Sequence, residues 1–345
     1  MKLTPGEIYF IGEREHETGN VTPYYKIGIV RDQEGRTTEE RLREHQTGNP
    51  RPLFIHSVIK AHAVERVETL MHRKFAQSRG TGEWFNFDDA SLSEAINAAR
   101  QFSDEIAIHI PLIEQAGLLK SVESTDKIIE PGGSTNKWFM AYHSAKSVVQ
   151  MYGELDGEIR ELLKVAVARG ERPAGVKQQK IRNTEYFNLA RLQQELPELY
   201  ANYLVENSTL VQRFIVKPAT DAQFQQEIEP SVLATAERIR TEIQLVRDEV
   251  KTADLLQPLR LVIFENSSNA EWQLEIAEAH LRVATGTNAG IDGITTWKRA
   301  YKPKQSFDEN AFKGENFELF KAYIDLKQTG GNLLIDAGQA AATQD

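Results

Sequence analysis

Apolar positions in the first hundred residues follow patterns that predict a small α+β domain. Residues 7–12 and 24–30 are rich in β-branched and aromatic side chains, which predicts two strands joined through a Gly/Asn/Thr/Pro loop at 19–23. A third apolar run at 53–60 predicts another strand. Over 62–77 the apolar residues recur at helical spacing and predict an amphipathic helix, through Val64, Val67, Leu70, Met71 and Phe75.

Polar residues between these segments predict where helices begin and end. Thr37 is placed to cap a helix, and Glu40 three residues later completes a capping box. That helix is expected to end at 48–50, where Gly favours a C-terminal cap and Pro cannot continue the helix. Ser91 is predicted to cap a helix that runs to about residue 101, and a further helix is predicted over 105–118.

The second half of the chain contains an internal repeat. Residues 187–203 can be laid over 307–323 at an offset of 120 residues. Each copy follows a long amphipathic helix, a Gly-containing turn and a strand-like segment, and each precedes another strand; the helices are at 139–169 and 268–285 and the following strands at 211–217 and 332–335. A repeated helix–strand–helix–strand unit implies a duplication, and one copy alone need not bury its apolar face.

These patterns divide the chain into five parts. Residues 120–137 change to a Ser-, Pro- and Gly-rich composition typical of a linker. A long charged amphipathic helix is predicted over 230–256. The predicted parts are a first domain at 1–118, a linker at 119–137, one repeat unit at 138–218, the long helix with the second repeat unit at 219–337, and a disordered tail at 338–345.

Composition supports a globular, multi-domain protein. A chain of 345 residues is longer than one ordinary domain, and 40% hydrophobic with 26% charged residues is a globular balance. No apolar run approaches the roughly 20 residues of a membrane span, and no apolar secretory segment follows Met1. Cysteine is absent, which excludes disulfides, thiolate zinc sites and a cysteine nucleophile, and which fits a cytoplasmic location.

The net charge of −9 is unusual for a nucleic-acid-binding protein, which normally carries a basic surface. The charge of a whole chain does not determine the charge of one face, however. Basic residues gather around two of the predicted helices and predict a local basic face: Arg36, Arg41, Arg43, Arg51, Arg73, Lys74 and Arg79.

Five chemically suited residues occur in a characteristic order along the first domain. Tyr9 lies in the first strand, Lys26 precedes Ile27-Gly28 in the second, Arg41 and His45 lie one turn apart on a helix, and Glu68 lies on the next helix. This order, followed by Gly82-Glu83-Trp84-Phe85, resembles the GIY-YIG nuclease superfamily and its phage-type DNA-binding branch, over roughly residues 6–88.

The resemblance implies a fold and a set of partners. It implies a three-stranded, mainly antiparallel sheet flanked by helices, with a mostly helical region after it. It also implies DNA as the partner. The repeat region, most clearly residues 296–323, loosely resembles the tail of YqaJ-type phage recombination exonucleases, and no catalytic residue is transferred from that likeness.

The resemblance also implies a role for each strand residue. Tyr9 corresponds to the tyrosine beside the nucleophilic water and acts as the general base or assists it. Lys26 stands where the superfamily usually has tyrosine, although some of its restriction enzymes use lysine. An ammonium there favours the phenolate of Tyr9, and a neutral Lys26 is the alternative base. Gly28 lets the backbone bend close to the site. Tyr25 is a weaker substitute, since strand alternation directs it to the opposite face from Lys26.

The helix residues supply the remaining chemistry. Arg41 corresponds to the arginine that contacts the scissile phosphate, a role suited to a planar, bidentate cation. His45 lies on the same helical face and orients or relays the proton. Glu68 corresponds to the single carboxylate that binds one divalent ion, Mg²⁺ with Mn²⁺ as an alternative.

Further contacts are predicted around this set. Arg43, Arg51 and Gly28 are the predicted nucleic-acid contacts. Asn86 is a weak candidate for the terminal asparagine of the superfamily. The role of His72, one turn after Glu68, is left open, because this pair lacks the two-histidine spacing of a zinc site.

Three functions are consistent with these features. The first is a metal-dependent DNA endonuclease associated with phages or mobile elements. The second is a non-catalytic DNA-binding protein on the same scaffold. The third is an adaptor whose C-terminal repeats bind a protein partner and recruit recombination enzymes.

Overall fold

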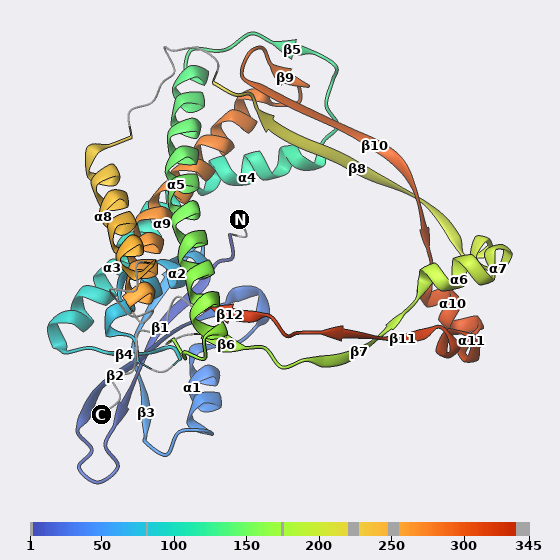
Figure 1. Cartoon of the computed structure of the whole chain (residues 1–345). Helices are drawn as coiled ribbons and strands as arrows, with labels where there is room; N and C mark the ends of the chain where they lie inside the picture. Colours follow the sequence, from blue (N-terminus) through green and yellow to red (C-terminus); the bar gives the residue numbers. More distant parts are fainter. Residues whose placement is uncertain (1–2, 81, 174–175, 220–227, 248–254, 336–345) are drawn as a thin grey trace.

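The computed structural model describes residues 3–335 except 81, 174–175, 220–227 and 248–254. An N-terminal sheet domain lies against a helical body, and two β-ribbons extend from the body to a small helical tip (Figure 1). The predicted α+β class, with a first sheet domain and a mostly helical region after it, is confirmed. No helix among the residues described is long and apolar enough to cross a membrane.

The N-terminal sheet is antiparallel, with strand order β3-β1-β2-β4. The three predicted strands are present, and the sheet has a fourth, which the sequence patterns did not predict. A three-residue segment is too short to display the period of a strand, so only its pairing with 24–26 defines it. The strands are β1 Gly6–Arg14, β2 Val21–Arg31, β3 Leu53–Ala61 and β4 Trp84–Asn86.

Alternation along β1 separates the core from the site. Ile8 and Phe10 face the main core, where they pack with side chains of α2 Val64–Lys74 and α3 Asp89–Ala107. Tyr9 and Ile11 face the other layer, where Leu42 of α1 Thr38–Gln46 covers them. Successive residues of a strand point to opposite faces, so one strand supplies both the core and the candidate site.

The start of α1 follows its sequence prediction. The Thr37 hydroxyl accepts a hydrogen bond from the Glu40 amide at 3.2 Å, and the Glu40 carboxylate accepts one from the Thr37 amide at 3.0 Å. This capping box satisfies two amides that lack helical partners, and such caps contribute about 1 kcal/mol. It fixes the start of the helix that carries Arg41 and His45.

The cap of α3 differs from its prediction. Asp88, not Ser91, is the N-cap, because the Asp88 carboxylate accepts from the Ser91 amide at 2.7 Å and from the Ser91 hydroxyl at 2.6 Å. Aspartate and serine both cap helices well, so residue type alone did not choose between them. The helix also continues past residue 101 to Ala107, and α4 Ile110–Leu118 follows it.

Residues predicted as a linker follow the edge of a second sheet, whose order is β5-β9-β10-β8. Strand β5 Ile128–Ile129 pairs in parallel with β9 Gly290–Ile291. The Ser124 amide also donates to the Arg299 carbonyl at 2.9 Å. The Ser-, Pro- and Gly-rich composition predicted a linker. The backbone groups of this segment form hydrogen bonds with residues that are far away in the sequence.

Three long helices form the body: α5 Thr135–Ala168, α8 Pro230–Arg247 and α9 Leu256–Thr285. Their shared core includes Tyr152, Ile159 and Ile239. Trp272 and Ile276 of α9 extend into the N-terminal core and attach the two parts to each other. The predicted helix at 230–256 corresponds to α8, and part of it, like the predicted tail, lies outside the described residues.

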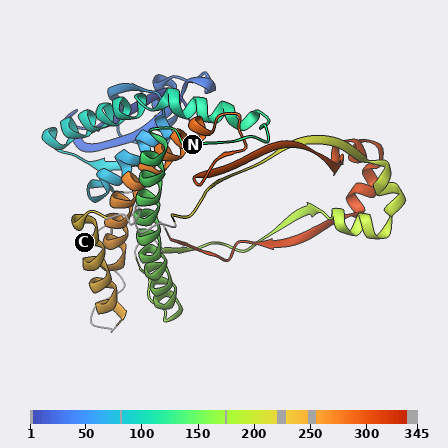
Figure 2. The same ribbon diagram turned by 90° about the horizontal axis from the view of Figure 1, so that it is seen from above.

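Two β-ribbons and a helical tip complete the chain (Figure 2). The upper ribbon pairs β8 Leu204–Val216 with β10 Thr295–Phe307. The lower ribbon pairs β7 Arg182–Phe187 with β11 Ile324–Thr329, and β6 Val176–Gln178 with β12 Leu333–Ile335. The tip contains α6 Leu189–Glu195, α7 Pro197–Asn202, α10 Glu309–Glu315 and α11 Phe317–Ala322, so the 120-residue offset also relates the helix bounds.

Candidate active site

The site is built around a buried phenol. Tyr9 is only 1% exposed, yet its hydroxyl reaches the Nε2 atom of His45 on α1 at 3.1 Å. Gly28 lies directly opposite Tyr9 in the β1–β2 pairing, and the phenol ring lies across it. The strand therefore positions the hydroxyl, and the helix positions the imidazole that bonds to it.

Gly28 is required by this close approach, which gives a first testable prediction. A Cβ at Gly28 would lie 2.3 Å from the Tyr9 hydroxyl oxygen and 2.5 Å from Cζ, so an alanine displaces the ring. We expect Gly28→Ala to lower the free energy of unfolding in urea by about 1–3 kcal/mol, the usual cost of overpacking. Gly48→Ala, where a Cβ meets nothing within 4 Å, is the control and should stay close to wild type. Equal effects of the two variants would contradict the crowding argument.

His45 is suited to accept a proton. Burial first, then the positive charges of Lys26 and Arg41, lower the pKa of His45 below its usual range. The ring is therefore neutral at pH 7, and we assign Nε2 as the acceptor of the Tyr9 hydroxyl proton. Burial raises the pKa of Tyr9 despite the opposing effect of Arg41, so the phenol is protonated and can donate.

Arg41 lies at the solvent side of this pair. Burial alone would lower the pKa of Arg41, but Tyr9 and the hydrogen bond to Glu44 raise it, so the guanidinium stays charged. Its Nη1 donates to the Glu44 carboxylate at 2.6 Å, and 29% of the side chain is exposed. A guanidinium that is partly exposed can bind a phosphate that reaches the site.

Lys26 has a partner that sequence reasoning missed. Lys26 is 8% exposed, and its ammonium forms an ion pair with the Glu83 carboxylate. Burial, the largest single effect, raises the pKa of Glu83, but the hydrogen bond and charge of Lys26 together with the charges of His72 and Arg79 outweigh it and lower the pKa. Glu83 had been noted only within the segment 82–85. Its two neighbours in the chain mark its position. Gly82 before it has φ +68°, and Trp84 after it pairs with Lys26 in the sheet.

Glu68 is the candidate site residue that α2 carries. Burial, followed by the negative charge of Glu83, raises the pKa of Glu68 to about 7. Within the described part of the chain, its carboxylate makes neither a hydrogen bond nor an ion pair. Arg41 lowers and Glu68 raises the pKa of Tyr9, and Lys26 lowers the pKa of both His45 and Glu68, so the five predicted residues are close enough to affect one another electrostatically.

The donor set fits a hard divalent ion held by few protein ligands. A partly buried carboxylate that lacks a hydrogen-bond partner and is repelled by a second carboxylate gains most from a cation. No group of three or more His, Asp or Glu side chains that could hold an ion occurs among the residues described. An ion at Glu68 would therefore take its other ligands from water and phosphate, as Mg²⁺ commonly does.

Most of the predicted basic face is already neutralised. Arg36 and Arg41 both contact Glu44, and Arg51 forms an ion pair with the buried Glu13. Arg73 and Lys74 bind Glu271 and Glu94. Arg43 is exposed and donates only to the Glu39 carbonyl at 3.4 Å. The matched part of the chain, residues 6–102, has thirteen lysines and arginines against fifteen carboxylates, a net charge of −2.

Two residues of open role are also placed. His72 contacts the Ile27 carbonyl at 3.4 Å and the Phe85 ring, and burial lowers its pKa. Asn86 is exposed at the edge of the sheet, where it pairs with Tyr24. His72 therefore lies in the core behind β2, and Asn86 lies on the strand outside the Tyr9 pair.

Comparison with known proteins identifies the class of this domain. Residues 6–102 match the family model of the T5orf172 domain, a phage-associated domain. The match supports a nuclease or DNA-binding function, with DNA as the partner. A search of the curated proteins and a search of the solved structures found no match.

Proposed function

We propose that the protein is a metal-dependent DNA endonuclease of the GIY-YIG type. The observation that carries the proposal is the Tyr9–His45 hydrogen bond, which lies near a charged, partly exposed Arg41. The nearby Glu68 carboxylate has no hydrogen bond or ion pair among the described residues. Hydrolysis of a phosphodiester requires an activated water, a cation at the phosphate and a path for the proton. These residues supply all three from three adjacent elements.

The proton path runs through the phenol to the imidazole. A water held by the Tyr9 oxygen transfers a proton to that oxygen while its own oxygen bonds to phosphorus. Tyr9 simultaneously passes its hydroxyl proton to Nε2 of His45, which becomes an imidazolium. The bond from phosphorus to the leaving oxygen breaks, and that oxygen takes a proton from solvent. His45 is partly exposed and returns its proton to water.

Arg41 and Glu68 act on the phosphate side. Arg41 binds a non-bridging oxygen and stabilises the charge that develops on the phosphate. Glu68 would hold the divalent ion, Mg²⁺ or Mn²⁺, which supplies further positive charge to the phosphate when bound. The two residues lie on α1 and α2, and Tyr9 interacts with both.

The choice between the two predicted bases favours Tyr9. Lys26 donates to Glu83 in an ion pair, and an ammonium has no lone pair with which to accept a proton. Its positive charge instead contributes to lowering the pKa of His45, which keeps that ring available as the acceptor. Lys26 therefore has a positioning and electrostatic role in this proposal.

The experiment is a plasmid-nicking assay with the full chain. Supercoiled plasmid is incubated with protein in Mg²⁺, in Mn²⁺, and with a chelator, and the relaxed form is measured by gel electrophoresis. We expect conversion to the relaxed form with either ion and none with chelator. Retardation of the plasmid without nicking under every ion would overturn the proposal in favour of a non-catalytic DNA-binding protein.

A further inference from the structure

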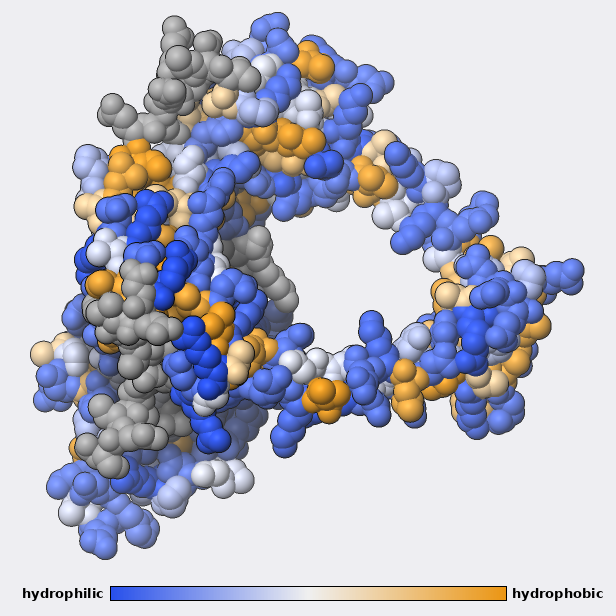
Figure 3. Space-filling model, in the orientation of Figure 1, coloured by the Kyte–Doolittle hydropathy of each residue, from blue (hydrophilic) through white to orange (hydrophobic). Residues whose placement is uncertain are grey.

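The two ribbons, the tip and the body enclose an opening that side chains do not fill (Figure 3). The chain leaves α5, follows the lower ribbon to the tip and returns along the upper ribbon (Figure 1). It meets α5 again where Nε2 of His143 contacts the Lys217 carbonyl at 3.0 Å and where Phe139 and Phe214 share a small core. Residues 139–217 therefore form a closed loop. Strands β10 and β11 of the second repeat copy follow the same loop and pair antiparallel with β8 and β7 of the first copy.

The lengths of its sides give the approximate size of the opening. Helix α5 has 34 residues and is about 50 Å long at 1.5 Å per residue. Each ribbon contributes 12 to 13 residues between body and tip, about 40 Å at the rise of a strand. A triangle with these sides encloses a circle roughly 25 Å across, measured between the axes of the elements, and the backbone and side chains take part of this width.

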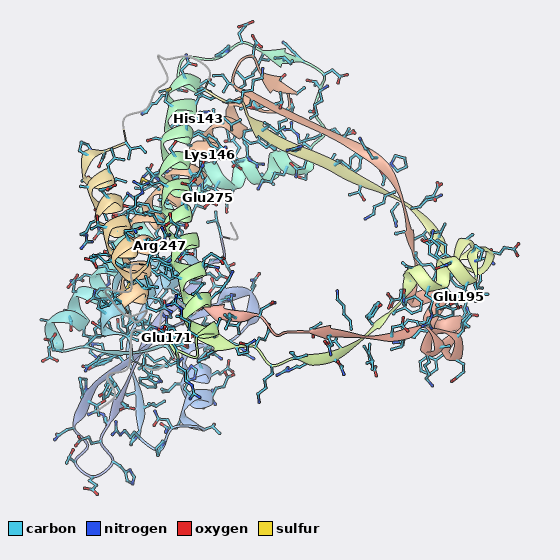
Figure 4. The ribbon with its side chains drawn as sticks, in the orientation of Figure 1. His143, Lys146, Glu171, Glu195, Arg247 and Glu275 are labelled. Atoms are coloured by element: carbon cyan, nitrogen blue, oxygen red, sulfur yellow. The ribbon has the colours of Figure 1, made fainter. Side chains whose placement is uncertain are left out.

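The tip joins the two copies with a reciprocal set of bonds. The Tyr203 hydroxyl donates to Glu315 at 2.7 Å, and the Tyr323 hydroxyl donates to Glu195 at 2.9 Å. Both pairs are related by the 120-residue offset. The amide of Asn188 donates to the Tyr323 carbonyl at 2.8 Å, as its counterpart at 308 does to Tyr203. The copies are thus related by a local two-fold axis at the tip, where Figure 4 labels Glu195.

The upper ribbon carries its basic residues on one face. In an antiparallel pair, residues directly opposite each other share a face, as do positions two apart along one strand. Lys298 lies opposite Arg213, and Lys302 and Lys304 follow at even spacing on the same strand. All four are exposed and have no ion pair among the described residues. The one carboxylate of this ribbon, Glu206, lies opposite Gln305 on the other face.

The lower ribbon repeats this pattern. Lys327 lies opposite Thr184, and Arg182 lies opposite Thr329, so both cations share one face. The 120-residue offset relates Arg182 to Lys302, which places the basic faces of the two ribbons in equivalent positions. Asp325 lies on the same face, and its carboxylate accepts hydrogen bonds from Arg191 and Asn188 of the tip.

The excess of positive charge on the ribbons contrasts with the rest of the chain. Residues 176–187, 204–216, 295–307 and 324–335 hold nine lysines and arginines and three carboxylates, a net charge of +6 in a chain of net charge −9. In the N-terminal domain the corresponding cations are mostly paired, whereas the exposed cations of the two ribbon faces make no ion pair among the described residues. Arg299 is the exception, because it is buried and donates to the Val122 and Gly286 carbonyls. An unpaired basic stripe on an acidic protein points to a polyanion.

We infer that the opening holds double-stranded DNA and that the basic face of each ribbon contacts the phosphates of one strand. The two-fold relation favours a duplex over a single strand, because the antiparallel strands of a duplex are themselves related by two-fold axes perpendicular to the helix. This inference rests on the proposed function for its choice of DNA. It assigns the main electrostatic contact to the ribbons instead of the T5orf172 domain.

A salt-trap experiment tests enclosure directly. The full chain carrying Glu68→Gln, which prevents cleavage, is first bound to a linear duplex with biotin at both ends. Streptavidin is then added to one half of the sample, and salt is raised to a level that removes electrostatic contacts. We expect the complex with blocked ends to persist at least about ten times longer than the complex with open ends, because only sliding off an end releases it. Equal lifetimes would overturn the inference.

Charge variants test the assigned surface. The triple variant Lys298→Gln, Lys302→Gln and Lys304→Gln should reduce the slope of log affinity against log salt by about two to three, near 0.9 for each lost phosphate contact. The control is Lys164→Gln with Arg238→Gln and Arg240→Gln, exposed residues of α5 and α8 that remove the same charge. Equal slopes for the two triple variants would contradict the assignment.

These outcomes separate the inference from the proposed function. If the protein nicks plasmid, but the lifetimes with blocked and open ends are equal and the salt slopes of the two triple variants are equal, only the enclosure of DNA is refuted. A protein that is trapped on blocked duplex but cleaves neither plasmid nor a linear duplex with open ends loses the catalytic proposal alone, because an open end can enter a closed loop and a circular plasmid cannot.

Discussion

Replacement of Glu68 by glutamine is expected to abolish Mg²⁺-dependent nicking, with a loss of at least about 10³-fold, because the amide removes the one carboxylate available to hold the ion. The substitution preserves shape and leaves Tyr9, His45 and Arg41 in place. DNA binding measured without metal should change little. Nicking of supercoiled plasmid under single-turnover conditions gives the rate.

The same substitution is expected to stabilise the folded protein at neutral to alkaline pH, although it abolishes nicking. The pKa of Glu68 is raised from 4.5 to about 7 in the folded protein, so the folded state binds this proton more tightly than the unfolded state does. The free energy of unfolding of the wild type therefore falls as pH rises from about 4.5 to about 7. Above pH 7 the ionised Glu68 lowers the free energy of unfolding by the full amount, roughly 1–3 kcal/mol for a partly exposed group.

Glu68→Gln lacks this cost and should be more stable than wild type at pH 8 in chelator, while the two should be equal at pH 4. Adding Mg²⁺ at pH 8 should stabilise the wild type and not the variant. Urea unfolding at both pH values, with Glu94→Gln as an exposed carboxylate control, measures these differences. A variant that nicks like wild type, or that is destabilised at pH 8, would remove Glu68 from the site.

Tyr9→Phe is expected to reduce the rate of nicking by about 10²- to 10⁴-fold, the usual contribution of a positioned proton-transfer group. The ring continues to fill its place across Gly28, whereas the hydroxyl that connects water to His45 is lost. Binding of DNA should persist, because phosphate contacts by Arg41 and the ribbons do not involve the phenol. Rates under saturating protein separate the chemical step from binding.

Tyr25→Phe is the matched control for this variant. Tyr25 is 4% exposed and belongs to the same sheet, but alternation directs its ring into the main core instead of the Tyr9 layer. Its variant should nick at the wild-type rate. If Tyr9→Phe also nicks at the wild-type rate while His45→Gln does not, the proton passes directly from water to the imidazole, and the relay through Tyr9 is wrong.

Enclosure of the duplex and cleavage of it have separate structural origins. The T5orf172 domain is attached to the body through Trp272 and Ile276 of α9, and α9 leads into the β9–β10 segment at the base of the upper ribbon. A duplex held by the ribbons is therefore anchored to the same helices as the site that would cut it. In this proposal, the ribbons supply the main phosphate contacts for a domain whose matched residues have a net charge of −2.

The sequence determined the local features of the protein. Periodicity and turn residues predicted the three longer strands, the capping box at Thr37 and Glu40, and the strand–helix order of the repeat, because these depend on neighbours in the chain. The order of Tyr9, Arg41, His45 and Glu68 predicted a phage-type domain, and the family match to residues 6–102 confirmed the phage-type class. The catalytic roles of these residues remain predictions.

Tertiary structure alone decided the features that join distant parts of the chain. Glu83 becomes the partner of Lys26 only when β4 pairs with β2, and the segment at 122–129 gains its partners only from β9 and β10. The closed loop depends on pairings across roughly 80 to 150 residues, which leave no periodic trace in the sequence. The net charge of −9 describes the chain as a whole. The strand register, in contrast, places Lys298, Lys302 and Lys304 on one face of the upper ribbon.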